Sequence, residues 1–300
     1  MLIPIFLGIF LASVLLVPSA LAVDPNPSYQ DKGDFYLIIE PTEDYEGYEV
    51  WLEEEQYFEL QIPFLNNTFK LPYDVGVIVT ECGEENAWYD PNEKTIVMCY
   101  ELLHETAWRF ANSWDEEGYE WTDEELSYSW VNVIEGVFYH EVGHALIAIY
   151  ELPTTGPEES VADQFSAYIL LEFPYDDDPT NSLGQDAMSD TAWDYQLRAQ
   201  EDPNLTESAF ADTHALDQQR FYDLACWAYG SDPNYNQYMI DYNWIPEHRL
   251  VWCESEYHDG VYAWDVLLAP FAQDYLLQNT EGEIIYSVWE DSEYQYLHKL

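Results

Sequence analysis

Two histidines four residues apart, with a glutamate directly after the first, stand in the segment YHEVGHALIAIY at positions 139–150. If this segment is an α-helix, His140 and His144 leave the same face, and their imidazoles can bind one metal ion. Glu141 then lies close enough to act as a general base toward a water molecule at the metal. Gly143 has no side chain, and we interpret it as leaving the approach to the metal open. The spacing favours a zinc site on this helix.

A buried amphipathic helix is the competing interpretation, because the motif stands among apolar residues such as Val142, Leu146 and Ile147. A histidine on an apolar helix face usually belongs to the core. Two histidines and a glutamate on such a face, however, all need polar partners, because an unpaired buried polar group costs kilocalories. A metal ion satisfies these side chains together, so we favour zinc.

A third ligand is needed, because a catalytic zinc ion takes three protein ligands and keeps one position open. The metzincin pattern would place it six residues after the second histidine, but Tyr150 stands there. The segment PEESVADQF at positions 157–165 offers carboxylates instead. Glu159 and Asp163 share one helix face, which allows Glu159 to bind zinc while Asp163 holds a ligand histidine. Glu158 is expected to point elsewhere and to interact with the helix N-terminus.

The combination H-E-x-x-H followed by E-x-x-x-D resembles the gluzincin metallopeptidases, the group that includes thermolysin. This resemblance implies that Glu159 is the third zinc ligand and that Asp163 supports His140. It also implies that Asn86 and Ala87, in ENAWYD at positions 85–90, form an edge-strand rim that binds the substrate backbone. A plain hairpin without a binding role is an equal alternative for that segment.

The same resemblance suggests a role for His214 in ADTHALDQQRF, since gluzincins place a histidine or tyrosine in their C-terminal lobe to stabilise the oxyanion. Capping of a helix that begins near Asp212 is the alternative. Longer segments are similar to a bacterial family of unknown function described as metallopeptidases, and the similarity spans about positions 35–271. These segments are ECGEENAWYDPNEKTIVMCYELL, FYHEVGHALI, ELPTTGPEESVADQF and ALDQQRFYDLACWAYGSDP, together with the late cysteine at Cys253.

The resemblance implies a zinc-dependent metallopeptidase that hydrolyses peptide bonds of a peptide or protein substrate by a zinc-activated water, with Glu141 as general base. Two alternatives stay open. The first is a zinc-stabilised binding or structural protein without turnover. The second is a zinc hydrolase that acts on a substrate other than a peptide.

The order of the expected elements, strands first and helices later, predicts an α+β fold. The strand-like segments cover 35–40, 75–80 and a hairpin over 86–89 and 95–100. We expect a mostly antiparallel sheet with an edge hairpin, an active-site helix over 128–150 and a helical C-terminal lobe, as in the zincin-like fold. Thr122 and Glu125 predict a capping box before that helix. Further helices are expected over 101–114, 158–171, 191–200, 212–229 and 261–277, with a surface loop over 174–190.

Residues 1–22 have the pattern of a signal peptide that ends in a small-residue cleavage site, although an uncleaved membrane anchor is the alternative. A linker over 23–34, one domain over 35–277 and an unassigned tail over 278–300 complete the organisation. In an exported chain, the four cysteines predict two disulfides. Cys82 and Cys99 flank the hairpin turn and pair locally, which leaves Cys226 for Cys253.

The charge balance is extreme, with 59 acidic against 8 basic residues and a formal net charge of -51. Such a chain repels nucleic acids and anionic membrane surfaces, so neither is expected as a partner. The signal-peptide pattern favours a protein that is secreted, periplasmic or at the cell surface, and not held in a membrane after cleavage.

Overall fold

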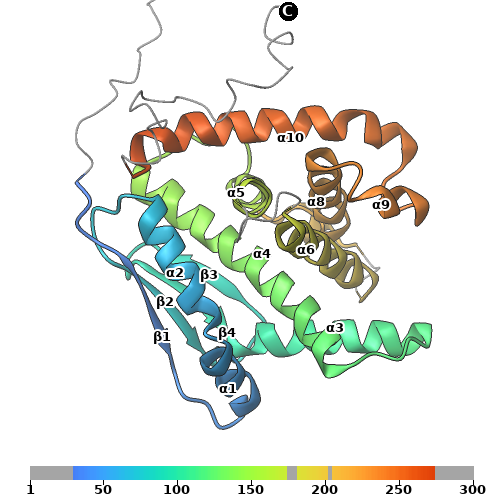
Figure 1. Ribbon diagram of the computed structural model, residues 1–300, viewed down its shortest axis with the longest axis horizontal. Coiled ribbons are helices and arrows are strands. Elements are labelled where there is room, and N and C mark those ends of the chain that lie inside the picture. Colours follow the sequence, from blue (N-terminus) through green and yellow to red (C-terminus); the bar gives the residue numbers. More distant parts are fainter. Residues whose placement is uncertain (1–29, 174–180, 202–204, 274–300) are drawn as a thin grey trace, which may run out of the picture.

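The computed structural model describes residues 30–173, 181–201 and 205–273, and the strands precede most of the helices along the chain (Figure 1). The strands are β1 (Phe35–Ile39), β2 (Val75–Thr80), β3 (Ala87–Asp90) and β4 (Thr95–Cys99). The helices that position the site are α3 (Tyr100–Glu117), α4 (Asp123–Tyr150), α5 (Glu158–Glu172), α6 (Ser182–Glu201), α8 (Asp217–Ser231) and α10 (Glu247–Leu268). Shorter helices are α1 (Glu46–Glu55), α2 (Tyr57–Thr68), α7 (Glu207–Phe210) and α9 (Gln237–Asp241), followed by the 3-10 turn η1 (Ala269–Phe271). The expected α+β class with a helical C-terminal part is confirmed.

The sheet has the order β1-β2-β4-β3 and is mixed. β1 pairs with β2, and β2 with β4, in parallel, while only β3 and β4 form an antiparallel pair. The expectation of a mostly antiparallel sheet is therefore wrong. Along the chain, helices α1 and α2 connect β1 to β2. They return the chain to the end of the sheet where β1 began, so β2 runs in the same direction as β1. The predicted hairpin is present, and its strand β3 forms one edge of the sheet.

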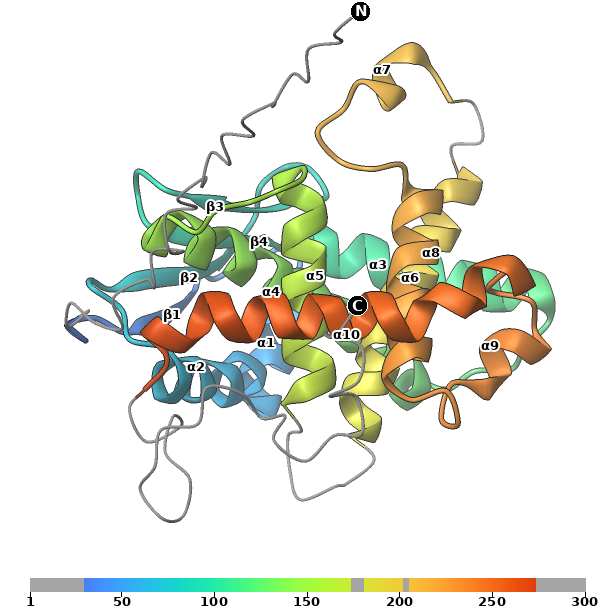
Figure 2. The same ribbon diagram turned by 90° about the horizontal axis from the view of Figure 1, so that it is seen from above.

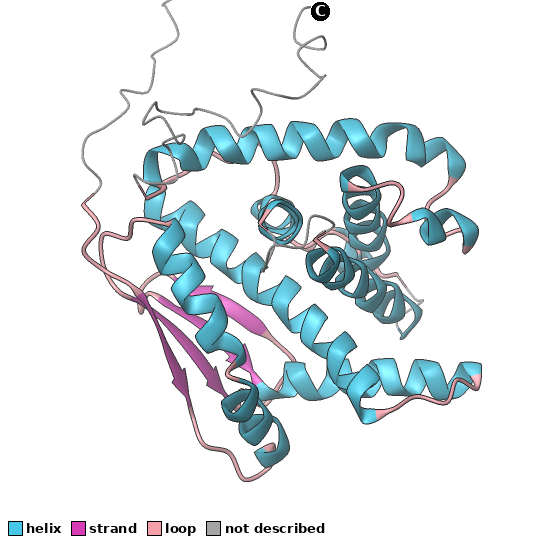
Figure 3. Ribbon diagram, viewed as in Figure 1, coloured by secondary structure: helices cyan, strands magenta, loops and turns pink. Residues whose placement is uncertain are grey.

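One face of the sheet packs against helices, and Figure 3 shows the strands gathered on one side of the molecule with the helices beyond them. Val77, Ile96 and Met98 point to this covered face and are fully buried. On the opposite face, Tyr36 and Ile38 are exposed. Buried and exposed side chains thus alternate along the strands, and the buried side chains form the face that packs against α2 and α4.

Helix α4 runs through the centre of the molecule and contacts the sheet as well as α3, α5 and α6 (Figure 1). Its start is the predicted capping box, in which the Glu125 backbone N–H donates to Thr122 Oγ1 and the Thr122 N–H donates to the Glu125 carboxylate. A side chain at Gly143 would have its Cβ 3.1 Å from Phe165 Cβ and 3.3 Å from Ala162 Cα. Gly143 therefore permits the close approach of α4 and α5, which corrects the interpretation that it keeps the approach to a metal open.

The C-terminal helices pack on the side of α4 that faces away from the sheet. Figure 2 shows α10 running across α5 and α8, and both packings are direct. A disulfide between Cys226 and Cys253 joins α8 to α10, and a second one joins Cys82 to Cys99 beside the hairpin. Both predicted pairings are confirmed.

Several boundaries differ from the sequence-based expectation. Residues 182–190 belong to α6, because Gly184, Ala187 and Met188 are buried against neighbouring helices, so a loop over 174–190 is wrong for this part. Helix α8 begins only at Asp217, and the last long helix covers Glu247–Leu268 instead of 261–277. The signal peptide, most of the 23–34 linker and the tail over 278–300 lie outside the described residues. Among the helices that the structure describes, none combines the length and apolarity needed to cross a bilayer.

Candidate metal centre

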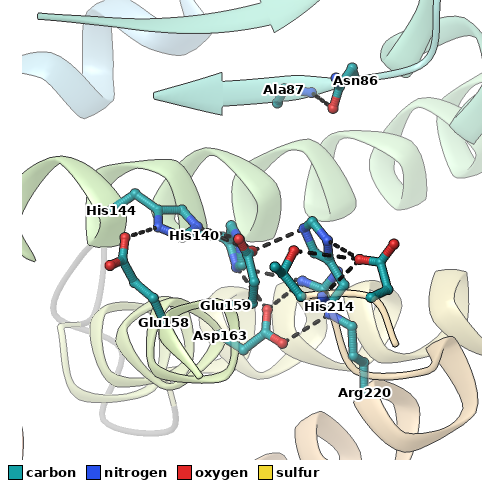
Figure 4. A network of polar contacts seen from close by, with 11 residues as sticks. Asn86, Ala87, His140, His144, Glu158, Glu159, Asp163, His214 and Arg220 are labelled. Carbon is teal, nitrogen blue, oxygen red and sulfur yellow. Dashed lines mark hydrogen bonds and ion pairs between the residues drawn. The ribbon is translucent and has the colours of Figure 1, made fainter. Parts of the chain in front are cut away.

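Helices α4 and α5 bring together the three residues that the sequence singled out as metal ligands (Figure 4). His144 Nε2 lies 3.1 Å from His140 Nε2 and 3.2 Å from Glu159 Oε2, and His140 Nε2 lies 3.3 Å from the same oxygen. Ligand atoms about 2.0–2.1 Å from a tetrahedral ion lie about 3.4 Å apart. The three donor atoms are therefore spaced as the corners of one face of a tetrahedron, which fits a small metal ion.

Each histidine is oriented by a carboxylate on its other ring nitrogen. His140 Nδ1 lies 2.8 Å from Asp163 Oδ1, as expected, and His144 Nδ1 lies 2.9 Å from Glu158 Oε1. Glu158 therefore does not point away from the site, and that expectation is wrong. It precedes Glu159 in the first turn of α5, where the orientation of the helix relative to α4 decides which carboxylate reaches which histidine. With a proton on each Nδ1, both Nε2 atoms are left to face a metal.

Arg220 on α8 is a residue of the site that the sequence analysis missed. Its Nε donates to Asp163 Oδ2 at 2.9 Å, its Nη2 donates to Oδ1, and its guanidinium lies 4.0 Å from the centre of the Tyr195 ring. Burial alone raises the pKa of Asp163, but Arg220 and then His140 reverse this and hold it well below its ordinary value. Asp163 therefore stays ionised while buried. An arginine beside apolar residues, in a chain with only 8 basic residues, is the signal that could have indicated it.

Glu141 is 6% exposed and lies on the buried face of α4. Burial raises the pKa of its carboxyl above the ordinary value, against the opposing effect of His140 and His144. A carboxylate with a raised pKa is a stronger base than one in water, which suits proton abstraction near neutral pH.

Besides the three-residue group, the described residues hold one other cluster of residue types that can bind a metal, formed by Cys82, Cys99 and Glu101. Its sulfurs are joined in a disulfide, so it offers no thiolate.

A family model described as "Putative metallopeptidase" matches residues 40–268. The chain belongs to this family. The match extends over the three residues of the metal centre and over Asp163 and Arg220. No curated protein and no solved structure shows significant similarity to the chain. Membership of a metallopeptidase family implies a metal ion and a peptide or protein substrate.

His214 also reaches the metal centre, from the loop between α7 and α8 (Figure 4). Its Nε2 lies 2.9 Å from Glu159 Oε2, and its Nδ1 lies 3.2 Å from Asp212 Oδ1. The side chain is 51% exposed, so it borders solvent at the open side of the site. Because α8 begins only at Asp217, His214 does not stand at a helix start near Asp212, and the capping alternative fails.

Edge strand β3 lies across from the histidines, with Asn86 and Ala87 at its beginning (Figure 4). The Ala87 N–H donates to Asn86 Oδ1 at 3.0 Å, and the Asn86 carbonyl accepts from the Cys99 N–H at 3.2 Å. Directly before them, Glu85 accepts two hydrogen bonds of 2.8 and 2.9 Å from Arg109 on α3 and is also paired with Arg198 on α6. The start of the edge strand is thus tied to two helices.

Proposed function

We propose that this chain is an exported zinc-dependent metallopeptidase of gluzincin type. His140, His144 and Glu159 bind the zinc ion, and Glu141 is the general base. The observation that carries the proposal is the set of donor atoms 3.1–3.3 Å apart in which each imidazole has a carboxylate on its Nδ1. Two imidazole nitrogens and one carboxylate form a ligand set typical of catalytic zinc, which leaves one position for substrate or water.

When bound, zinc would polarise the scissile carbonyl and make water a stronger nucleophile at neutral pH. Glu141 takes the proton from the attacking water and delivers it to the leaving amine. His214, whose Nε2 contacts Glu159 before substrate binds, would turn this N–H to the developing oxyanion. Asp163 and Glu158 fix the orientation of the two imidazoles, so the geometry exists before substrate arrives.

The outer edge of β3, which pairs with no further strand among the described residues, supports a peptide substrate over other hydrolysable groups. An extended peptide can add to such an edge through main-chain hydrogen bonds, and Asn86 and Ala87 lie where that edge faces the histidines. Export is supported by two disulfides, which persist mainly in oxidising compartments, and by the signal-peptide pattern of residues 1–22.

The test is cleavage of an unbiased peptide mixture by the mature chain and by Glu141→Gln, with zinc measured in both. Glu141→Gln keeps shape and polarity but removes the base, so we expect cleavage to fall by about 100-fold or more with zinc content unchanged. Glu124→Gln is a matched control, because Glu124 is exposed in the first turn of the same helix. Glu159→Ala should remove most of the zinc, whereas Glu158→Ala should weaken zinc binding by about 10–100-fold without abolishing it.

The alternatives predict different outcomes. A structural zinc site would leave the parent protein inert toward peptides while Glu159→Ala still lowers its zinc content and stability. A zinc hydrolase with another substrate would leave peptides intact yet hydrolyse ester or amide probes in a Glu141-dependent manner. Equal cleavage by the parent and Glu141→Gln would show that Glu141 is not the base.

A further inference from the structure

A cavity that is open to solvent lies apart from the metal centre, between α3, α4, α6, α9 and Trp244 just after α9. Its volume is about 360 Å³, and its lining includes Trp114, Trp193, Tyr238, Trp244, Asp186 and Asp190. It reaches α4 at Ser129, about 16 Å along the helix axis from His140 at 1.5 Å per residue. Small-molecule sites typically have volumes of about 300–1,000 Å³, so the cavity can hold a small ligand. Nothing in the proposed peptidase reaction uses it.

The walls of this cavity are aromatic, and their rings are held in place by one another. Trp193 and Trp244 stack with ring centroids 4.8 Å apart, and Tyr238 meets Trp244 edge-on at 5.6 Å. Trp114 packs edge-on against Phe110 at 5.8 Å. These indole and phenol rings are only partly buried, unlike most aromatic side chains of the core. Fixed aromatic faces attract cations through the negative potential above each ring.

Two carboxylates complete the lining. Asp186 accepts hydrogen bonds of 2.8 Å from the Tyr128 and Tyr235 hydroxyls, and Asp190 accepts one of 2.7 Å from Asn132 Nδ2. These donors are neutral, so they orient the carboxylates without neutralising them. Among the lining residues of the described chain, none is a lysine or an arginine.

Two buried aspartates elsewhere in the helical part differ from the half-buried Asp190 in their partners. Asp163 is paired with Arg220, and Asp194 with Arg109 and Arg198. Asp190 has no such partner among the ion pairs of the described residues, and burial raises its pKa to about 7. A positive charge in the cavity would stabilise its ionised form in the same way as arginine stabilises Asp163.

We propose that this cavity binds a small organic cation of the alkylammonium class, with its carbon groups against the Trp193, Tyr238 and Trp244 rings and its charge near Asp190. A hard metal ion such as Ca²⁺ would need about 6–8 oxygen ligands, which walls made mainly of aromatic rings do not supply. An uncharged ligand would gain no electrostatic attraction from Asp186 and Asp190. The site is independent of the metal centre and of the proposed peptidase activity.

The experiment is isothermal titration of the full mature chain with choline and with its uncharged isostere 3,3-dimethylbutan-1-ol, at constant ionic strength. We expect saturable binding of one choline per chain and binding of the isostere at least about tenfold weaker, because the isostere lacks both the cation–aromatic attraction and the attraction to the two carboxylates. Asp190→Asn should weaken choline binding by about tenfold, because it keeps the shape but removes the charge. Trp244→Ala should weaken it similarly, and Trp244→Phe, which keeps an aromatic face, should fall between.

Matched controls separate the cavity from the acidic surface. Asp259→Asn and Trp252→Ala change exposed residues of α10 and should leave choline binding unchanged. Equal affinity for choline and its uncharged isostere would overturn the proposal. Two further results would also overturn it: sodium that displaces bound choline as effectively as added choline does, or control variants that lose as much choline affinity as Asp190→Asn. Both results would indicate diffuse attraction to a surface of net charge -51.

Discussion

Arg220→Met tests whether the ion pair behind His140 supports only the fold or also the metal. Arg220 is 8% exposed, binds both oxygens of Asp163 and lies over the Tyr195 ring. Methionine keeps much of the side-chain length and leaves the Asp163 carboxylate buried without its counter-charge. Removing one partner of a buried ion pair costs about 3–5 kcal/mol, so we expect a loss of this size in the free energy of unfolding.

The same change should weaken zinc binding, because Asp163 orients His140 through the 2.8 Å contact to its Nδ1. Loss of such an outer partner typically costs about 10–100-fold in metal affinity. Arg220→Met combined with Asp163→Asn removes the unpaired charge. We expect the double variant to recover part of the stability lost in Arg220→Met, while its zinc affinity stays low.

Two assays separate these effects. Urea unfolding of the metal-free protein measures stability, and competition with a chromophoric chelator measures zinc affinity. Arg249→Met is a control, because Arg249 lies nearer the surface of α10 with Glu256 2.6 Å away, and it should cost about 1 kcal/mol or less. If Arg220→Met lowers stability but leaves zinc affinity unchanged, Arg220 is a core ion pair with no role at the metal. Strictly additive effects of the two substitutions on stability would show that Arg220 and Asp163 do not act as a pair.

Two further predictions concern pH and the edge strand. Burial raises the pKa of Glu135 on α4 from the ordinary 4.5 to about 8, so the folded chain keeps this proton to higher pH than the unfolded chain. The free energy of unfolding should therefore fall as pH rises from 4.5 to about 8, by at most roughly 5 kcal/mol, and Glu135→Gln should flatten this decline in urea titrations at several pH values. An unchanged pH profile in that variant would assign the decline to other groups. Glu85→Gln weakens the ties to Arg109 and Arg198 and should raise KM for peptides about tenfold with kcat and zinc content nearly unchanged, because it loosens the start of β3. A fall in kcat at constant KM would instead place the effect at the chemical step.

Local spacing was sufficient for much of the metal centre. His140 and His144 are one helical turn apart, so any helix through them presents both imidazoles on one face, whatever packs around it. The capping box at Thr122 and Glu125 likewise depends only on residues within one turn. The pairing of Cys82 with Cys99 followed from their positions on either side of a short hairpin. For these features, neighbours in sequence are neighbours in space.

Other features depended on contacts between distant segments. The parallel pairing of β1 with β2 is decided by how α1 and α2 cross the sheet, and that of β2 with β4 by which strand of the hairpin lies next to β2. Strand sequences alone do not encode direction. The closeness of α4 and α5 gave Gly143 its packing role and directed Glu158 toward His144.

The sequence by itself determined which residues could bind a metal, because ligand type and helical spacing are local properties. Only the tertiary structure decided what anchors Asp163, the carboxylate that orients His140. Asp163 and Arg220 are 57 residues apart in the chain, and the packing of α5 against α8 brings them together. The aromatic cavity arises in the same way, because Trp114, Trp193 and Trp244 stand on three segments that meet only after the helices have packed. Such sites are set by the burial of apolar faces across the whole domain, which no short segment specifies.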